Sequence, residues 1–156
     1  MSASGVQIFR MRKLLSHPFD APSWPADIHL TGLVPGIAKE VHDLLILGYQ
    51  NGGGSVPAFA DWWPALLSDP EFDASLCFLA KDKEGIVAVA QCWTSAFVKD
   101  LVVHPRRRNQ GIGASLLLHV YAMFHDRGAK TVDLKVEEGN IAAIRLYLKS
   151  GMQIVE

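Results

Sequence analysis

The fold of this chain is decided by the stretch Val103-His104-Pro105-Arg106-Arg107-Arg108-Asn109-Gln110-Gly111-Ile112-Gly113-Ala114. It follows an apolar run, residues 97–103, that predicts a strand, and it precedes a leucine-rich run, residues 115–124, that predicts a helix. The first backbone N–H groups of a helix have no internal partners and lie at the positive end of its dipole, so such a turn can bind a phosphate. Gly111 and Gly113 remove the Cβ atoms that would keep a ligand away, and the arginines offer donors to phosphate oxygens.

The glycine spacing excludes two common phosphate-binding motifs. Leu116 stands where the dinucleotide fingerprint needs its third glycine, and no Lys-Ser or Lys-Thr pair follows Gly113, so a P-loop is absent. The pattern Arg108-x-x-Gly111-x-Gly113 instead resembles the R/Q-x-x-G-x-G/A signature of the GCN5-related N-acetyltransferase (GNAT) family. The resemblance implies that this loop and the helix start hold the diphosphate of coenzyme A.

A second motif follows in the order expected for the same family, namely Leu134-x-Val136-x-x-x-Asn140-x-x-Ala143-x-x-Leu146-Tyr147-x-x-x-Gly151-Met152. From the residues alone, 131–137 alternates as a strand with Val132, Leu134 and Val136 on one face and Asp133, Lys135 and Glu137 on the other. Asn140 is a suitable N-cap for a helix that begins at Ile141, with a buried stripe expected at Ile141, Ile144 and Leu148. The resemblance, which covers about residues 75–156, implies that Asn140 contacts the pantetheine arm or caps this helix and that Tyr147 lies near the coenzyme sulfur.

The rest of the chain predicts further strands and two helices. Residues 17–25 contain three prolines, which exclude a regular helix. Short strands are expected at 6–12 and 27–31, helices at 37–49 and 58–67, and a hairpin from strands at 75–80 and 86–93. We therefore expect one domain spanning residues 1–156, of the α/β (α+β) class. The resemblance implies a mixed, mostly antiparallel central sheet flanked by helices on both faces.

Composition narrows the function classes. A chain of 156 residues with 49% apolar residues, 20% charged residues and a net charge of −1 is typical of a globular domain, and nothing global favours nucleic acid. Cys77 and Cys92 lack CxxC spacing, and the interpretation is two free thiols in a reducing compartment. No apolar run is long enough for a membrane span and no signal peptide is visible, so a cytoplasmic protein is expected. The six histidines show no metal-ligand spacing, so no metal is expected.

The resemblance implies acetyl-CoA as co-substrate, with pantetheine lying between strands 97–103 and 131–137. Its amides would bond free backbone groups of the first of these strands. The expected contacts with coenzyme A are Leu101, Val102, Val103, Arg108, Asn109, Gln110, Gly111, Ile112, Gly113, Ala114, Asn140 and Tyr147.

The reaction needs a base more than an acid. An alkylamine with a pKa near ~10.4 is neutral to only about one part in 10³ at pH 7, whereas a thiol with a pKa of about 8.5 leaves readily. A carboxylate that takes a proton from the amine would raise the fraction of neutral, reactive amine. Asp100 is the first candidate base, Glu137 the second and Tyr147 the candidate acid. For each carboxylate taken alone, a solvated strand residue is the commoner interpretation. The prediction is an N-acetyltransferase in which a primary amine, of a small molecule or a peptide, attacks acetyl-CoA directly in a ternary complex. The alternative is a non-catalytic acyl-CoA-binding or regulatory domain.

Two further expectations concern the surface. Only residues 152–156 follow the last glycine, so the sheet edge there is expected to need cover, from a partner subunit in a homodimer or from the strand at 6–12. Trp62 and Trp63 could line an apolar acceptor pocket, and core packing is the alternative. The glycine-rich run 51–55 predicts a flexible connector.

Overall fold

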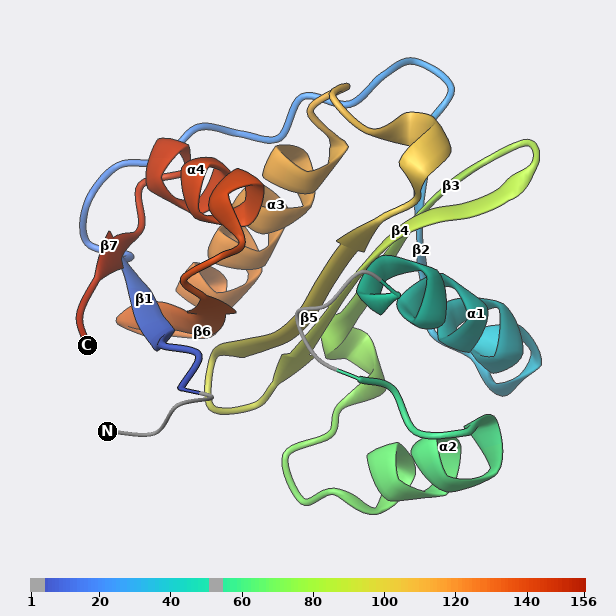
Figure 1. The fold of residues 1–156 in the computed structure, drawn as a ribbon. Helices are drawn as coiled ribbons and strands as arrows, with labels where there is room; N and C mark the ends of the chain where they lie inside the picture. The colour runs from blue at the N-terminus through green and yellow to red at the C-terminus, as the bar shows by residue number, and fades with distance from the viewer. Residues whose placement is uncertain (1–4, 51–54) are drawn as a thin grey trace.

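The computed structural model describes residues 5–50 and 55–156, and within them the strands form one seven-stranded sheet (Figure 1). The order is β2-β3-β4-β5-β6-β1-β7, and all neighbours are antiparallel except β5 and β6. The strands are β1 (Ile8–Leu14), β2 (His29–Gly32), β3 (Cys77–Asp82), β4 (Gly85–Trp93), β5 (Phe97–Val103), β6 (Thr131–Glu137) and β7 (Gln153–Ile154). The predicted mixed, mostly antiparallel sheet is therefore confirmed.

Helices cover both faces of the sheet, as expected. On one face α1 (Ala38–Tyr49) and α2 (Phe59–Ser68) pack over a core that includes Val89 and Val102. On the other face α3 (Ile112–Asp126) and α4 (Ile141–Lys149) pack over a larger core. Three short 3-10 turns complete the elements: η1 (Pro35–Ile37), η2 (Ala74–Leu76) and η3 (Pro105–Arg107).

The central helix α3 is stabilised by burial of one broad apolar face. Leu116, Leu117, Val120, Tyr121 and Phe124 are each at most 2% exposed, at the three- and four-residue steps of a helix. Burying an aliphatic or aromatic side chain of this size contributes about 1.5–3 kcal/mol. The helix stops before Gly128, which takes a φ of +84°, a conformation that glycine adopts readily at the end of a helix.

The proline-containing segment between β1 and β2 contains no helix, as predicted, and crosses the outer side of α3 (Figure 1). The Ser115 hydroxyl donates to the carbonyl oxygen of Ser23 at 2.6 Å and accepts from its N–H at 3.2 Å. The Phe19 ring packs edge-on against Tyr121, with 5.6 Å between centroids. The segment thereby links the two halves of the sheet across the helix that begins at the glycine loop.

Strand β1 occupies an interior place in the sheet, between β6 and β7. It pairs with β7 through Met11↔Ile154 and Arg12↔Gln153, so the N-terminal strand covers that side of the last strand. Asp133 of β6 is only 5% exposed, and Arg10 and Arg12 of β1 donate hydrogen bonds to its carboxylate at 2.7–2.9 Å. Burial alone would raise the pKa of Asp133, but these two guanidinium groups outweigh it and lower that pKa.

The buried stripe expected on α4 is only partly right. Ile144 packs against the core, but Ile141 and Leu148 are 54% and 50% exposed. The helix instead turns the face of Ala143 and Tyr147 inward, and Tyr147 is its one buried residue. Residues 143 and 147 are four apart, so the predicted helical spacing of buried residues is right. The predicted face is wrong at Ile141 and Leu148, which lie on the exposed side of the helix.

Candidate functional site

A cleft opens where the two parallel strands diverge. Strands β5 and β6 share only the register pairs Phe97↔Asp133 and Val98↔Leu134, and no pair is found beyond them among the described residues. Two adjoining cavities occupy this opening, which we call the interstrand cleft. The phosphate-end cavity, about 470 Å³, lies between β5, the start of α3 and α4. The inner cavity, about 330 Å³, lies between β5, β6 and α4. Volumes of this size are those of small-molecule sites.

The N-terminus of α3 faces the phosphate-end cavity with bare backbone donors. Gly111, with a φ of +77°, is the N-cap, and no side chain in the described part of the chain caps the helix. Ile112, Gly113 and Ala114 follow as the first helical residues and line the cavity. Their N–H groups precede the first intrahelical bond, which runs from the Ser115 N–H to the Gly111 carbonyl at 2.9 Å. The arrangement is chemically suited to an anion such as a diphosphate.

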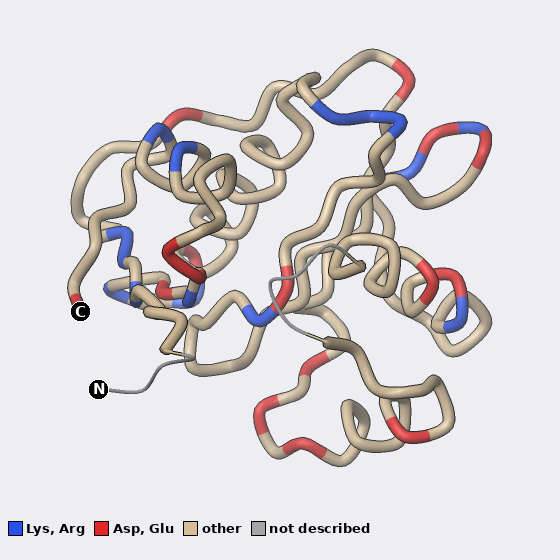
Figure 2. Tube along the Cα trace, in the orientation of Figure 1, with Lys and Arg blue, Asp and Glu red and all other residues tan. Residues whose placement is uncertain are grey.

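The three arginines before this helix do not play one role. In Figure 2 they form a continuous basic stretch just before α3, with acidic segments of the β3–β4 turn and of the loop before β2 beside it. Arg106 donates to Asp82 at 2.7 and 2.9 Å, and Arg107 donates to Asp82 at 2.8 Å and to Asp27 at 2.8 and 3.0 Å. These two arginines therefore neutralise carboxylates, contrary to the expectation that all three offer donors to a phosphate. Arg108 lines the cavity without an ion pair among the described residues.

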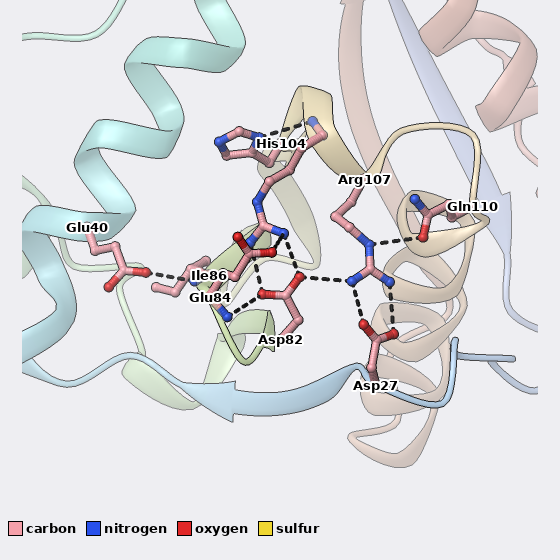
Figure 3. A network of polar contacts seen from close by, with 9 residues as sticks. Asp27, Glu40, Asp82, Glu84, Ile86, His104, Arg107 and Gln110 are labelled. Carbon is pink, nitrogen blue, oxygen red and sulfur yellow. Dashed lines mark hydrogen bonds and ion pairs between the residues drawn. The ribbon is translucent and has the colours of Figure 1, made fainter.

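The loop is held in place by this ion-pair cluster, which we define as Asp27, Asp82, Glu84, Arg106 and Arg107 (Figure 3). The hydrogen bond from Arg106 is the largest of the effects that lower the pKa of Asp82. Arg107 also donates from Nε to the Gln110 side chain at 2.9 Å. Gln110, predicted to contact coenzyme A, accordingly lies outside both cavities and belongs to the support of the loop.

The other residues predicted to contact coenzyme A lie together. Eleven of the twelve line the phosphate-end cavity: Leu101, Val102, Val103, Arg108, Asn109, Gly111, Ile112, Gly113, Ala114, Asn140 and Tyr147. Asn140 also caps α4, because its side-chain oxygen accepts from the Ala143 N–H at 3.3 Å. The predicted N-cap is thus confirmed.

Tyr147 is placed where both cavities meet. It is 8% exposed and lines each of them, together with Tyr49, Leu101, Asn140 and Ala143. Burial raises the pKa of its hydroxyl to about 12. The phenol therefore keeps its proton at neutral pH and can act as a donor inside the cleft.

The two candidate bases are separated by the sheet geometry. Glu137, at the end of β6, lines the inner cavity. Asp100 is 7% exposed and lines a different pocket of about 200 Å³, between β5 and the α1–α2 face, which we call the Asp100 pocket. Its carboxylate accepts from the Tyr49 hydroxyl at 2.7 Å and from Lys99 Nζ at 3.1 Å.

Sequence reasoning missed Tyr49 and Lys99, which connect these spaces. Tyr49 lines all three cavities, and Lys99 lines the inner cavity and the Asp100 pocket. The signal in the sequence was Gly48, a glycine inside a predicted helix, which can mark a close approach to another backbone. In the structure a Cβ at Gly48 would overlap both methyl groups of Val102, so the end of α1 lies directly against β5. Trp62 lines the Asp100 pocket, whereas Trp63 and Trp93 pack against the core of that face.

Other expectations are tested only in part. Cys77 and Cys92 are free and buried, and burial raises the pKa of the Cys77 thiol to about 12. Within residues 5–50 and 55–156, no helix is long and apolar enough to cross a membrane, and no three metal-ligating side chains gather. Most of the glycine-rich connector, residues 51–54, lies outside the described residues.

Comparison with known proteins agrees with this geometry. The chain is 30% identical to a mycothiol acetyltransferase of Thermobispora bispora, over 92% of this chain and 52% of the relative. It is 34% identical to a mycothiol acetyltransferase of Clavibacter michiganensis over 56% of this chain and 30% of the relative. A crystal structure of a GCN5-related N-acetyltransferase from Sphaerobacter thermophilus superposes with a TM-score of 0.79 at 27% identity, over 95% of this chain and 48% of that one. The chain thus spans about half, or less, of the length of these relatives.

The family assignment rests on sequence and fold together. The sequence model described as the acetyltransferase (GNAT) family matches residues 39–152, which include the α3 N-terminus, Asn140 and Tyr147. The fold agrees with that match, because it superposes on a GCN5-related N-acetyltransferase over 95% of this chain. The resemblance inferred from the two motifs is confirmed: the chain belongs to the acetyltransferase (GNAT) family.

Proposed function

We propose that this chain transfers an acetyl group from acetyl-CoA to a primary amine, by direct attack within a ternary complex. The observation that carries the proposal is the shared cleft. The bare N-terminus of α3 and the buried, protonated Tyr147 open into adjoining parts of one space. An anion site at one end and a proton donor in the middle suit a diphosphate-bearing thioester.

The residues present fit acetyl-CoA as a substrate. The N–H groups of Ile112, Gly113 and Ala114 and the guanidinium of Arg108 would hold the diphosphate. Beyond Val98, no described residue pairs with β5 on its β6 side, so the backbone groups there are available to the amides of pantetheine. Bound acetyl-CoA supplies the thioester, and Tyr147 would donate a proton to the departing sulfur.

The acceptor must lose a proton before it attacks. Glu137 faces the inner cavity and could take that proton directly. Asp100 could also serve, but its carboxylate lies in the separate Asp100 pocket. The choice between the two carboxylates is therefore a question about how the spaces are connected.

The acceptor class is a primary amine of a small molecule or a peptide. The relatives are mycothiol acetyltransferases, so an amine related to mycothiol is the first acceptor to test. These relatives are longer and contain regions that this chain does not match. The acetyl transfer proposed for this chain therefore does not follow from the match alone. Homodimer formation and a cytoplasmic location stay predictions.

The competing function is a domain that binds acyl-CoA without turnover. Such a domain needs the α3 N-terminus but neither a buried tyrosine nor a carboxylate beside the cleft. Tyr147 and Glu137 both line the inner cavity, which favours the enzyme.

The test is an acceptor screen. Purified protein would be mixed with acetyl-CoA and with panels of aminosugars, amino acids, aminoglycosides and peptides, and released thiol would be measured. Calorimetry with coenzyme A, ATP and NAD would run in parallel. Thiol release that depends on one acceptor class, with binding of coenzyme A alone, supports the proposal. Tight binding of acetyl-CoA with no release in any panel would favour the binding domain, and failure to bind it would reject both.

A further inference from the structure

Tyr49 stands between the cleft and a carboxylate that does not reach the cleft. It is the last residue of α1 and lines the phosphate-end cavity, the inner cavity and the Asp100 pocket. Asp100 lines only the last of these. Any effect of Asp100 on an amine in the interstrand cleft therefore has to pass through a neighbour.

The contact between the two side chains has the geometry of a proton path. The Tyr49 hydroxyl donates to Asp100 Oδ1 at 2.7 Å, and Lys99 Nζ donates to Oδ2 at 3.1 Å. The carboxylate is thus fixed from both ends and is 7% exposed. Because the phenol gives its single proton to Asp100, its oxygen lone pairs remain to accept from a third group.

Tyr49 cannot itself be the base at neutral pH. Burial, and then the nearby charge of Asp100, raise the pKa of its hydroxyl above the ordinary value of 10.0. A phenol that does not ionise can still pass a proton on, if it gives one to a carboxylate while it accepts another.

The position of Tyr49 is set by the packing of α1 on β5. Gly48 lets the helix backbone lie against the methyl groups of Val102, where any Cβ would overlap them. This close contact between α1 and β5 places Tyr49, the next residue of the helix, beside the interstrand cleft and the Asp100 pocket.

We propose that Tyr49 is the relay through which Asp100 deprotonates the acceptor amine, an inference that rests on the proposed acetyl transfer. A proton leaves the substrate ammonium for Tyr49 Oη as the Tyr49 hydroxyl proton moves to Asp100 Oδ1, so Tyr49 ends neutral. The amine nitrogen then forms its bond to the acetyl carbon, and the carbon–sulfur bond breaks. Of the two protons that the nitrogen loses, one ends on the thiol of coenzyme A and one reaches solvent from Asp100.

Glu137 is the alternative base, and the experiment must distinguish it from the relay through Tyr49. It lines the inner cavity without an intermediary, so a reaction that uses it needs neither Tyr49 nor Asp100. In the relay, Tyr49 and Asp100 act as one unit, so removing the functional group of either residue has the same effect on the rate.

The experiment compares Tyr49→Phe, Asp100→Asn, the double variant and Glu137→Gln with the wild type. Tyr121→Phe is the control, since it removes a buried hydroxyl that has no hydrogen-bond partner among the described residues. The readouts are kcat/KM for the best amine of the acceptor screen from pH 5 to 10, the Kd for acetyl-CoA, and the Tm.

We expect Tyr49→Phe and Asp100→Asn each to lower kcat/KM on the order of 10²-fold, the double variant to be no worse than either, and the Kd to stay unchanged. The acid limb of the pH profile, which reports the essential base, should flatten in all three. Tyr121→Phe should match the wild type. Asp100→Asn leaves Tyr49 intact, so it tests the path even if Tyr49→Phe folds poorly.

Three results would overturn the relay: a Tyr49→Phe variant of full rate, losses that multiply in the double variant, or a loss confined to Glu137→Gln. A drop in Tm that accounts for the lost rate through a smaller folded fraction would also count against it. A wild type that binds acetyl-CoA but acetylates no amine would instead reject the proposed function, before any variant is compared.

Discussion

Asp82, at the end of β3, accepts hydrogen bonds from both terminal nitrogens of Arg106, at 2.7 and 2.9 Å. The Asp82 side chain is only 2% exposed, and it also accepts from Arg107 and from the backbone N–H of Glu84. One carboxylate therefore joins the β3–β4 turn to the loop that precedes α3, the proposed coenzyme-binding helix. Its negative charge would repel a diphosphate if the arginines did not neutralise it.

We predict that Asp82→Asn loosens this loop and weakens binding of coenzyme A. The guanidinium groups of Arg106 and Arg107 would lose their buried charged partner, at a cost of about 1–3 kcal/mol in the free energy of unfolding. The Kd for coenzyme A, measured by calorimetry, should rise roughly 10-fold, equivalent to about 1.4 kcal/mol.

Glu84→Gln is the matched control for this variant. Glu84 also forms an ion pair with Arg106, at 3.2 Å, but the Glu84 side chain is 67% exposed. Exposed ion pairs contribute about 0–1 kcal/mol, so the Tm and the Kd should barely change. Equal effects of the two variants would show that the buried position of Asp82 has no special role.

The same carboxylate predicts a dependence of stability on pH. The hydrogen bond from Arg106 and the other contacts lower the pKa of Asp82 from 3.8 in the folded protein. Between the folded and unfolded values the unfolded chain binds more protons, so acid favours unfolding. The stabilisation is complete above about pH 5 and is lost as the pH falls through and below about 4. The Tm of the wild type should therefore fall more steeply than that of Asp82→Asn between pH 6 and 3, and parallel curves would contradict this.

The fold was largely predictable because its signals are local. Strand 97–103 and strand 131–137 have the predicted bounds, and the glycine loop, the Asn140 cap and the Gly128 stop lie where backbone chemistry requires them. These features depend on residues a few positions apart in the sequence. Most of the predicted coenzyme contacts line one cavity for the same reason, since they lie on two short contiguous segments and one helix.

The pairings between distant residues could not be predicted. Nothing local shows that Arg106 and Arg107 meet Asp82 and Asp27, or that Asp133 is buried by Arg10 and Arg12 across β1. Asp100 was chosen from its strand, yet its partner Tyr49 lies 51 residues away. Alternation along a strand predicts a face, but the sheet order determines what covers that face.

Gly111 and Gly128 form a natural pair for testing the coenzyme site. Both have a positive φ, +77° and +84°, and neither would bring a Cβ against another atom. Alanine at either position should cost about 1–2 kcal/mol of stability for the same backbone reason. Only Gly111→Ala should raise the Kd for coenzyme A by roughly 10-fold or more, because Gly111 lines the cavity and Gly128 follows the other end of the same helix. Calorimetry and melting curves on both variants decide the matter. A Gly111→Ala protein with normal affinity would remove the helix N-terminus from the site.

Gly48→Ala tests whether the close packing of α1 on β5 positions Tyr49. The added methyl group would overlap Val102, so α1 must move away from β5. Overpacking of this kind costs about 1–3 kcal/mol, and we expect a lower Tm together with a lower kcat/KM for the amine. Gly36→Ala is the control, because a Cβ at Gly36 meets no atom within 4 Å. A Gly48→Ala variant as stable and active as Gly36→Ala would mean that the close approach of helix and strand is dispensable.

Tyr147→Phe tests the proton donor. The hydroxyl is buried where the two cavities meet, and burial raises its pKa to about 12, so it stays protonated across the working range of the enzyme. Its removal should lower kcat on the order of 10²-fold while the KM for acetyl-CoA changes little, because the donor is needed only as the sulfur departs. A raised pKa also means that loss of this proton cannot cause an alkaline limb below about pH 11 in the wild type. Steady-state rates from pH 6 to 10 should thus differ between wild type and variant by a constant factor. A ratio that shrinks as the pH rises within that range would show that the Tyr147 hydroxyl itself loses its proton there, which would contradict its raised pKa.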